Sequence, residues 1–110
     1  MAKKTAQWFM PGWWHARQKK KALLAYVRAR DGDLCWLCHH PMRFGPPFNV
    51  GKAATVEHLL AKSMGGKSDP HNLRLCHKGC NKHLGVLPPE QKERMRHSLA
   101  REKASRAVMG

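Results

Sequence analysis

Two cysteine pairs constrain the fold of this chain more than any other feature of its sequence. Cys35 and Cys38 are separated by two residues, and Cys76 and Cys80 by three. Four thiolates in this arrangement can bind one zinc ion tetrahedrally, and such a site supplies folding free energy to a small domain. His77 lies inside the second pair and could compete for the ion, but four thiolates already complete the tetrahedron. We therefore expect a structural zinc ion on the four cysteines.

Disulfides are the alternative use of four cysteines in a small protein, and they are typical of secreted chains. The N-terminus has lysines but lacks the continuous apolar stretch of a secretory signal, so we expect an intracellular protein with reduced cysteines. The sequence also lacks a run of about 18 apolar residues, so no membrane-spanning helix is expected. Zinc is therefore favoured over disulfides.

The charge of the chain is strongly positive. Lysine and arginine number 21 against 7 acidic residues, which gives a formal net charge of +14 and a sequence pI near 10.3. Such a field attracts polyanions, and nucleic acid is the commonest polyanion inside a cell. An anionic membrane surface would need a helix with a strong apolar face, and neither candidate helix has one. We expect a nucleic-acid partner and no membrane.

The length of 110 residues fits one domain with two tails. Residues 1–15 are predicted to form an irregular aromatic and basic arm, residues 16–87 the central domain, and residues 88–110 a basic C-terminal helix. The large rings of the arm either pack onto the domain as a hydrophobic clasp or stack on nucleic-acid bases. The clasp is favoured because exposed rings would make an aggregation-prone patch. The rings are Trp8, Phe9, Trp13 and Trp14.

Apolar periodicity and turn residues predict an α+β chain. Gly32 can take the left-handed conformation that ends a helix, and prolines suit the first turn of the last one. The predicted elements are a helix over residues 16–30, a loop over 39–52, strands over 53–60 and 73–76, a short helix over 78–85 and a charged helix over 90–107.

The segment between the two cysteine pairs is longer than a structural zinc site requires. An ordinary zinc ribbon closes a loop of roughly 15 to 20 residues between its pairs, whereas 37 residues separate Cys38 from Cys76. This segment contains Glu57 followed by His58, a carboxylate–histidine pair that a purely structural site would not need. The pattern indicates that the zinc site frames a second, catalytic site.

Several motifs around this segment occur in the order found in one nuclease family. They are residues 30–38 (RDGDLCWLC), 56–60 (VEHLL), 63–66 (SMGG) and 72–81 (NLRLCHKGCN). This order closely resembles the HNH endonuclease family, over about residues 28–85. The resemblance implies a ββα-metal core, a hairpin followed by a helix, with a four-cysteine zinc site. The flanking N- and C-terminal helices expected from periodicity lie mostly outside it. The resemblance also implies a hydrolase that cuts DNA and leaves a free 3′-hydroxyl and a 5′-phosphate.

Hydrolysis of a phosphodiester needs an activated water and a cation that neutralises charge on the phosphate. A histidine that titrates near neutrality can take the proton from water, which makes His58 the candidate general base. Hard divalent cations such as Mg²⁺ or Mn²⁺ prefer oxygen ligands, and Glu57 is the only carboxylate between Asp33 and Asp69. The family usually has aspartate at this position, and the extra methylene of glutamate leaves the preferred ion open.

Two asparagines complete the candidate catalytic site. The third family position falls on Asn81, directly after Cys80, where an amide oxygen can coordinate Mg²⁺ or Mn²⁺. His83 is the alternative ligand, two residues further along the predicted helix. Asn72, the middle residue of the family motif, is expected to bond the backbone of the loop that carries His58.

Strand geometry places one condition on this site. Strict alternation sends Glu57 and His58 to opposite faces, so both can serve one phosphate only if the strand bends or ends there.

The nearby cations Lys62, Lys67 and Arg74 are the candidates for binding the DNA backbone.

The sequence thus predicts a cytoplasmic, bacterial or phage-encoded nuclease acting on double-stranded DNA with low sequence specificity. No base-reading element is evident, so a partner protein that directs targeting is also expected. A non-catalytic zinc module that binds nucleic acid is the alternative, although it leaves the carboxylate–histidine pair unexplained. A nuclease that acts on structured DNA or on RNA is the other alternative.

Overall fold

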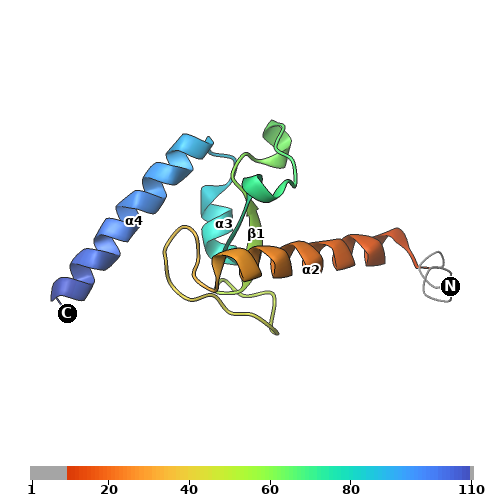
Figure 1. Ribbon diagram of the computed structural model, residues 1–110, viewed down its shortest axis with the longest axis horizontal. Coiled ribbons are helices and arrows are strands. Elements are labelled where there is room, and N and C mark those ends of the chain that lie inside the picture. Colours follow the sequence, from red (N-terminus) through yellow and green to blue (C-terminus); the bar gives the residue numbers. More distant parts are fainter. Residues whose placement is uncertain (1–9, 110) are drawn as a thin grey trace.

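The computed structural model describes residues 10–109, and within them the chain has the expected α+β class. A two-stranded antiparallel sheet lies at the centre, and helices extend from it on either side (Figure 1). Short 3-10 turns connect the strands. The elements in chain order are α2 (Gly12–Asp31), β1 (Ala54–His58), η1 (Lys62–Met64), η2 (Pro70–Asn72), β2 (Leu73–His77), α3 (Lys78–Leu84) and α4 (Pro89–Met109).

The hairpin register decides which side chains share a face of the sheet. Glu57 pairs with Arg74, and Thr55 pairs with Cys76. Because directly opposite residues of an antiparallel pair point to the same side, these four side chains lie on one face. α3 and the first turn of α4 bond to this face, through Asn81 to Thr55 and through a lysine of α4 to Glu57.

The hydrophobic core lies between α2, the hairpin and the loop that follows α2. Val27 of α2 is fully buried, as is Leu73 of β2. Trp36 in the loop donates its backbone N–H to the carbonyl of Leu75 at 2.8 Å, which attaches the loop to β2. The remaining buried members of this cluster are Cys35, Leu37, Met42, Leu75, Cys76 and Leu84.

The first helix begins earlier than the sequence predicts. α2 starts at Gly12, so residues 12–15 are helical rather than part of an irregular arm. Pro11 precedes the helix with extended backbone angles, and its carbonyl accepts the N–H of Trp14 at 3.0 Å. The Pro-Gly pair therefore marks the start of the helix.

The expected aromatic clasp does not form at Trp13. Its side chain is 64% exposed and lies 5.5 Å from the guanidinium of Arg17, one turn further along α2. Trp8 and Phe9 lie outside the described residues. α2 ends directly before Gly32, as expected, and Gly32 donates its N–H to the carbonyl of Arg28, but its φ of 89° and ψ of −161° lie outside the left-handed helical region that the sequence suggests.

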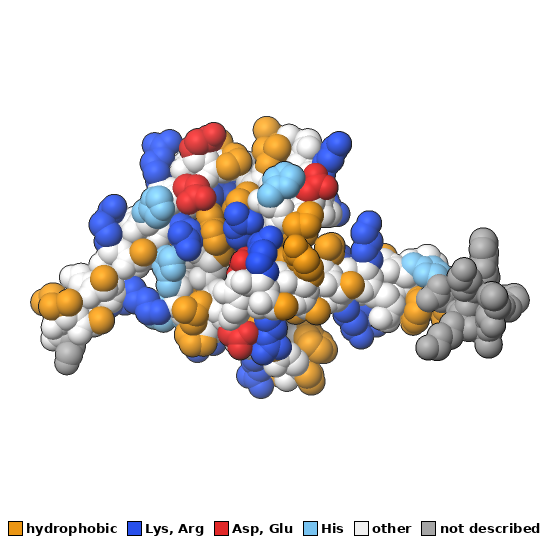
Figure 2. Space-filling view, in the orientation of Figure 1, with side chains coloured by type: hydrophobic (Ala, Val, Ile, Leu, Met, Phe, Trp, Pro, Cys, Tyr) orange, Lys and Arg blue, Asp and Glu red, His pale blue; other side chains and the backbone are white. Residues whose placement is uncertain are grey.

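α2 and α4 project from the hairpin in different directions, which gives the described chain a long axis of 59 Å (Figure 1). Figure 2 shows one face of the molecule, on which lysine and arginine side chains are spread from α2 to α4 with few acidic side chains among them. No helix within residues 10–109 is long and apolar enough to cross a membrane.

Candidate functional site

A cluster of three cysteines and one histidine lies where the loop after α2 meets the end of β2. The ligand-capable atoms of Cys35, Cys38, His77 and Cys80 all lie within 4.8 Å of one another. Nδ1 of His77 is 3.3 Å from the Cys38 sulfur and 3.7 Å from the Cys80 sulfur. Its other ring nitrogen lies 2.8 Å from the carbonyl oxygen of Pro41, the kind of outer contact that orients a metal-binding histidine. These four residues, called the Cys/His cluster below, could hold a zinc ion.

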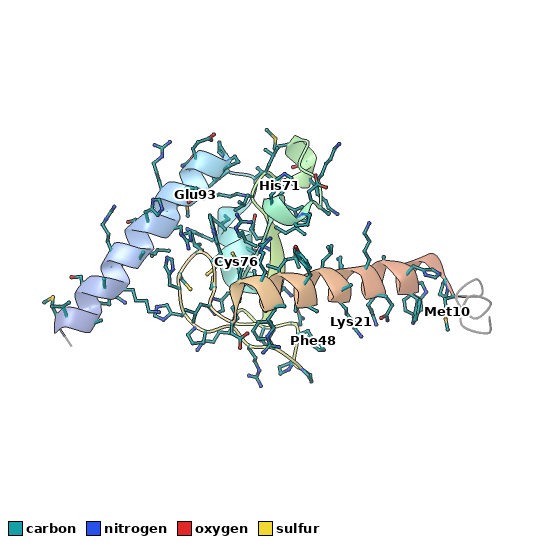
Figure 3. All side chains as sticks on the ribbon, viewed as in Figure 1. Met10, Lys21, Phe48, His71, Cys76 and Glu93 are labelled. Carbon is teal, nitrogen blue, oxygen red and sulfur yellow. The ribbon has the colours of Figure 1, made fainter. Side chains whose placement is uncertain are left out.

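The Cys/His cluster differs from the expected four cysteines in one member. Cys76 stands outside the cluster, and His77 takes its place. The Cys76 thiol is hydrogen-bonded to the Cys35 thiol, whereas the imidazole of His77 lies close to the thiols of both Cys38 and Cys80. Cys76 is fully buried in the core instead, at the centre of the molecule (Figure 3).

Spacing is one sign in favour of the histidine, although it does not exclude Cys76. His77 and Cys80 are separated by two residues, as are Cys35 and Cys38, whereas Cys76 and Cys80 are separated by three. The hydrogen bond between the Cys76 and Cys35 thiols raises the pKa of Cys76 and lowers the pKa of Cys35 to about 3.

A second, smaller site lies at the other end of the hairpin. A cavity of about 220 Å³ is bordered by Glu57 and His58 of β1 and by Asn81 of α3. His58 is the last residue of β1, so the strand ends where the carboxylate–histidine pair requires it to end. The structure therefore brings these three candidate residues to one cavity. Its other lining residues are Val56, Ala61, Lys62 and Gly85.

Glu57 is almost completely buried, with 2% of its surface exposed. Its Oε1 lies 2.8 Å from Nζ of Lys92, whereas its Oε2 is buried without a hydrogen-bond partner among the described residues. Burial raises the pKa of Glu57, and the hydrogen bond and charge of Lys92 act against that rise. Sequence reasoning misses Lys92, because a lysine in a charged helix is normally solvent-exposed.

His58 is half-buried beside the same cavity. Its Nε2 lies 3.0 Å from the hydroxyl oxygen of Ser68, a contact that the sequence does not predict. Burial lowers the pKa of His58, and the positive charges of Lys62 and Lys92 lower it further. The imidazole is therefore held toward its neutral form, which is the form able to accept a proton.

Asn81 reaches the cavity from α3. Its amide Nδ2 donates to Oγ1 of Thr55 at 3.2 Å and to the carbonyl of Val56 at 3.1 Å. These two bonds fix the side chain and leave Oδ1, the atom that can coordinate a cation. His83 is exposed and does not line this cavity.

Asn72 binds the backbone of the loop that follows His58. Its Oδ1 accepts the N–H of Leu60 at 2.9 Å, and its Nδ2 donates to the carbonyls of Leu60 and Lys67 at 3.1 and 2.8 Å. One side chain thus connects the end of β1 with the glycine turn. Gly66, in the glycine turn, lies so close to the backbone of Leu60 that a Cβ at this position would be 1.7 Å from the Leu60 carbonyl oxygen.

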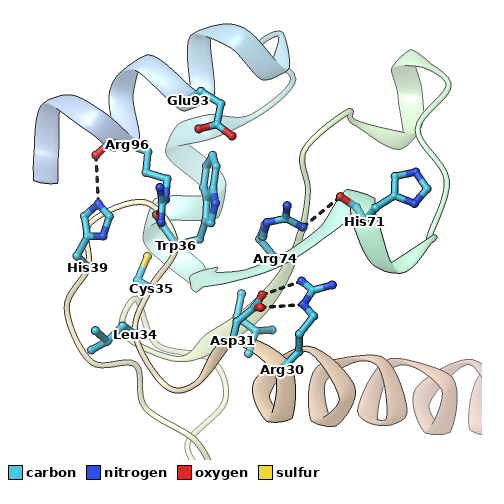
Figure 4. A pocket seen from close by; sticks show the side chains of 11 residues that line it. Arg30, Asp31, Leu34, Cys35, Trp36, His39, His71, Arg74, Glu93 and Arg96 are labelled. Atoms are coloured by element: carbon cyan, nitrogen blue, oxygen red, sulfur yellow. Dashed lines mark hydrogen bonds and ion pairs between the residues drawn. The ribbon is translucent and has the colours of Figure 1, made fainter.

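A larger cavity of about 700 Å³ lies between the end of α2, β2 and α4 (Figure 4). Three arginines from three different elements line it, together with the ring of Trp36. Arg74 donates to the carbonyls of His71 and Leu73, and Arg96 lies over Trp36 and donates to its carbonyl. Arg30 is held by Asp31.

The three cations expected to bind DNA lie in three different places. Arg74 lines the larger cavity, and Lys62 lines the smaller one. Lys67 belongs to the loop between η1 and η2.

A comparison of this chain with protein-family models, curated proteins and solved structures finds no match. The two sites must therefore be interpreted from their own residues.

Proposed function

We propose that this chain is an HNH-type endonuclease that hydrolyses phosphodiester bonds of DNA with the help of a divalent cation. The observation that supports this most is the meeting of Glu57, His58 and Asn81 at one small cavity, with a buried carboxylate oxygen left unpartnered among the described residues. A carboxylate, a neutral imidazole and an amide oxygen are the groups that such a hydrolysis needs.

The unpartnered oxygen supports a cation at this place. A buried acceptor without a partner costs about 1–3 kcal/mol, and Mg²⁺ or Mn²⁺ bound to Oε2 of Glu57 would remove that cost. Oδ1 of Asn81 is a second hard, neutral ligand at the same cavity. When bound, the ion would neutralise negative charge that develops on the phosphate.

His58 is the general base of the proposed reaction. Its neutral imidazole accepts a proton from water while the water oxygen bonds to phosphorus and the bond to the 3′-oxygen breaks. The leaving 3′-oxygen takes up a proton from solvent water, which gives a 3′-hydroxyl and a 5′-phosphate. The contact with Ser68 at 3.0 Å holds the imidazole in place for this step.

The Cys/His cluster has a structural role in this proposal. Zinc bound there would join the loop after α2 to the end of β2 and the start of α3, and so fix the position of Asn81 directly after Cys80. The net charge of +14 supports binding to double-stranded DNA through its phosphates, with Lys62, Lys67 and Arg74 nearest the proposed site. We also propose that the protein acts in the cytoplasm of a bacterial cell and that a partner protein selects the DNA sequence.

Cleavage of supercoiled plasmid tests the proposal. The zinc-loaded protein should nick plasmid in the presence of Mg²⁺ or Mn²⁺ and stop when a chelator is in excess. His58→Ala should lower the rate by about 10²–10⁴-fold without weakening DNA binding, because a general base acts in the chemical step. His97→Ala, at an exposed histidine of α4, is the matched control and should cleave at the parent rate.

A non-catalytic zinc module that binds nucleic acid is the second candidate. One observation favours it: the Lys92–Glu57 ion pair already compensates the buried carboxylate without a divalent ion. Tight DNA binding with no metal-dependent cleavage of plasmid, structured DNA or RNA would select this candidate. Cleavage of RNA or of branched DNA alone would keep the chemistry and change the substrate.

A further inference from the structure

Lys92 is fully buried in the first turn of α4, and its ammonium contacts both members of the carboxylate–histidine pair. Nζ donates to Oε1 of Glu57 at 2.8 Å and to the backbone carbonyl of His58 at 2.9 Å. Lysine is almost never fully buried unless it is paired. The backbone N–H of Lys92 bonds to the carbonyl of Pro88, which anchors the residue at the start of its helix.

This arrangement divides the two oxygens of Glu57 between two uses. Oε1 is held by the ammonium, and Oε2 has no partner among the described residues. A cation that enters the cavity therefore meets one available carboxylate oxygen in a fixed orientation. It also meets a positive charge directly behind that carboxylate, and like charges in a poorly solvated site repel strongly.

Stability alone is a weak reason for this ion pair. A buried pair contributes little net stability compared with well-packed apolar residues, even when further hydrogen bonds satisfy the remaining protons of its ammonium. Here the same ammonium also holds the carbonyl of His58, so one side chain fixes the orientation of Glu57 and the end of β1 together.

We propose that Lys92 is the positioning residue of this site and sets its affinity for the divalent ion. It holds Oε1 so that Glu57 offers Oε2 alone, and its charge weakens the binding of the ion. This inference rests on the proposed function, because it assumes that Glu57 binds the cation of the reaction.

Removal of the ammonium should change metal affinity and turnover in opposite directions. In Lys92→Met, both oxygens of Glu57 become available and the repelling charge is gone, so Mn²⁺ should bind at least about tenfold more tightly. Turnover at saturating Mn²⁺ should fall, because the carboxylate and the end of β1 lose their fixed orientation. A lysine with only a structural role would lower the amount of folded protein and would leave the affinity of the folded fraction unchanged.

Mn²⁺ binding to zinc-loaded protein is measured by the loss of the free-ion electron paramagnetic resonance signal, at about pH 8.5 to limit competition by protons. Arg94→Met removes one exposed positive charge from the same helix and should leave the affinity within about twofold. Glu57→Gln should lose this binding. Unchanged or weaker Mn²⁺ binding by folded Lys92→Met would overturn the inference.

Two further measurements keep the test decisive if Lys92→Met does not fold. Lys92→Gln removes the same charge but keeps a hydrogen-bond donor, and it should show the same tightening. In the nuclear magnetic resonance spectrum of the wild-type protein, Mn²⁺ should strongly broaden the side-chain resonances of Lys92. It should leave those of Lys20, far along α2, unaffected. Equal broadening of the two lysines, or no broadening of Lys92, would contradict the inference. A wild-type protein that binds Mn²⁺ but cuts no nucleic acid would refute the proposed function instead.

Discussion

Nδ1 of His77 lies 3.3 Å from the sulfur of Cys38, although 39 positions separate the two residues in the chain. Zinc at this point would join the loop after α2 to the last residue of β2, immediately before α3 begins. α3 carries Asn81, whose amide bonds to β1. The Cys/His cluster and the smaller cavity are therefore mechanically connected through one short helix.

Separate alanine substitutions of the adjacent residues Cys76 and His77 can identify the fourth zinc ligand. His77→Ala should lose zinc and most of the folded state, because a structural zinc site with three ligands no longer closes its tetrahedron. Cys76→Ala should keep one zinc per chain and lose only a small amount of core packing. Elemental analysis and thermal unfolding of both variants provide the measurements. Retention of zinc by His77→Ala together with its loss from Cys76→Ala would restore the four-cysteine set.

Asn81 can be tested as the ligand carried by α3. Asn81→Ala should lose most plasmid cleavage and recover part of it at high metal concentration, because one oxygen ligand is missing. Asn81→His should stay active and change its preference toward nickel, cobalt or zinc, which imidazole binds better than it binds magnesium. His83→Ala, two residues away and exposed, is the control and should matter little. The reverse outcome, with His83→Ala inactive and Asn81→Ala active, would move the ligand to His83.

Much of the hairpin and its helix could be predicted from sequence because local signals agree there. The two strands, the start of α3 within the second cysteine pair and the glycine after α2 follow from residue type and spacing, although β1 ends at His58, two residues before the predicted end. Three of the four members of the Cys/His cluster follow from the cysteine pattern. His77 does not, because four cysteines already satisfy the ligand count.

The contacts of Glu57 and His58 could not be predicted in the same way. Lys92 reaches Glu57 across 35 positions, and its burial depends on how α4 docks against the hairpin. No periodic pattern in α4 distinguishes Lys92 from its exposed neighbours. Ser68 likewise reaches His58 only because the glycine turn folds back toward the end of β1.

DNA binding should depend steeply on salt and little on sequence. The affinity of a protein that neutralises phosphates falls with a log–log slope of about −0.9 per phosphate on duplex DNA. Lys62→Gln should reduce the size of that slope by about one and leave the ranking of unrelated duplexes unchanged. Fluorescence anisotropy with several duplexes over a range of salt concentrations measures both. A nearly flat response to salt, or strong discrimination among the duplexes, would contradict this prediction.

The glycine turn offers a test of the loop geometry that does not depend on any ligand. Gly66 lacks a positive φ, so a larger residue there would not strain its own backbone. A larger residue at position 66 would instead clash with its surroundings, because its Cβ would lie 1.7 Å from the carbonyl oxygen of Leu60 and 2.9 Å from that of Ala61. Both obstacles are backbone atoms in the loop directly after His58, so Gly66→Ala must displace that loop.

Gly66→Ala should therefore cost about 1–3 kcal/mol or more in the free energy of unfolding, as overpacking does elsewhere. It should also weaken the bonds between Asn72 and Leu60 and so reduce plasmid cleavage, while zinc content stays at one per chain. Gly51→Ala is the matched control, because a Cβ there meets no atom within 4 Å and should have little effect. Denaturant unfolding and zinc analysis of the two variants make the comparison. Equal stability of Gly66→Ala and Gly51→Ala would mean that the turn does not hold the loop as closely as the structure places it.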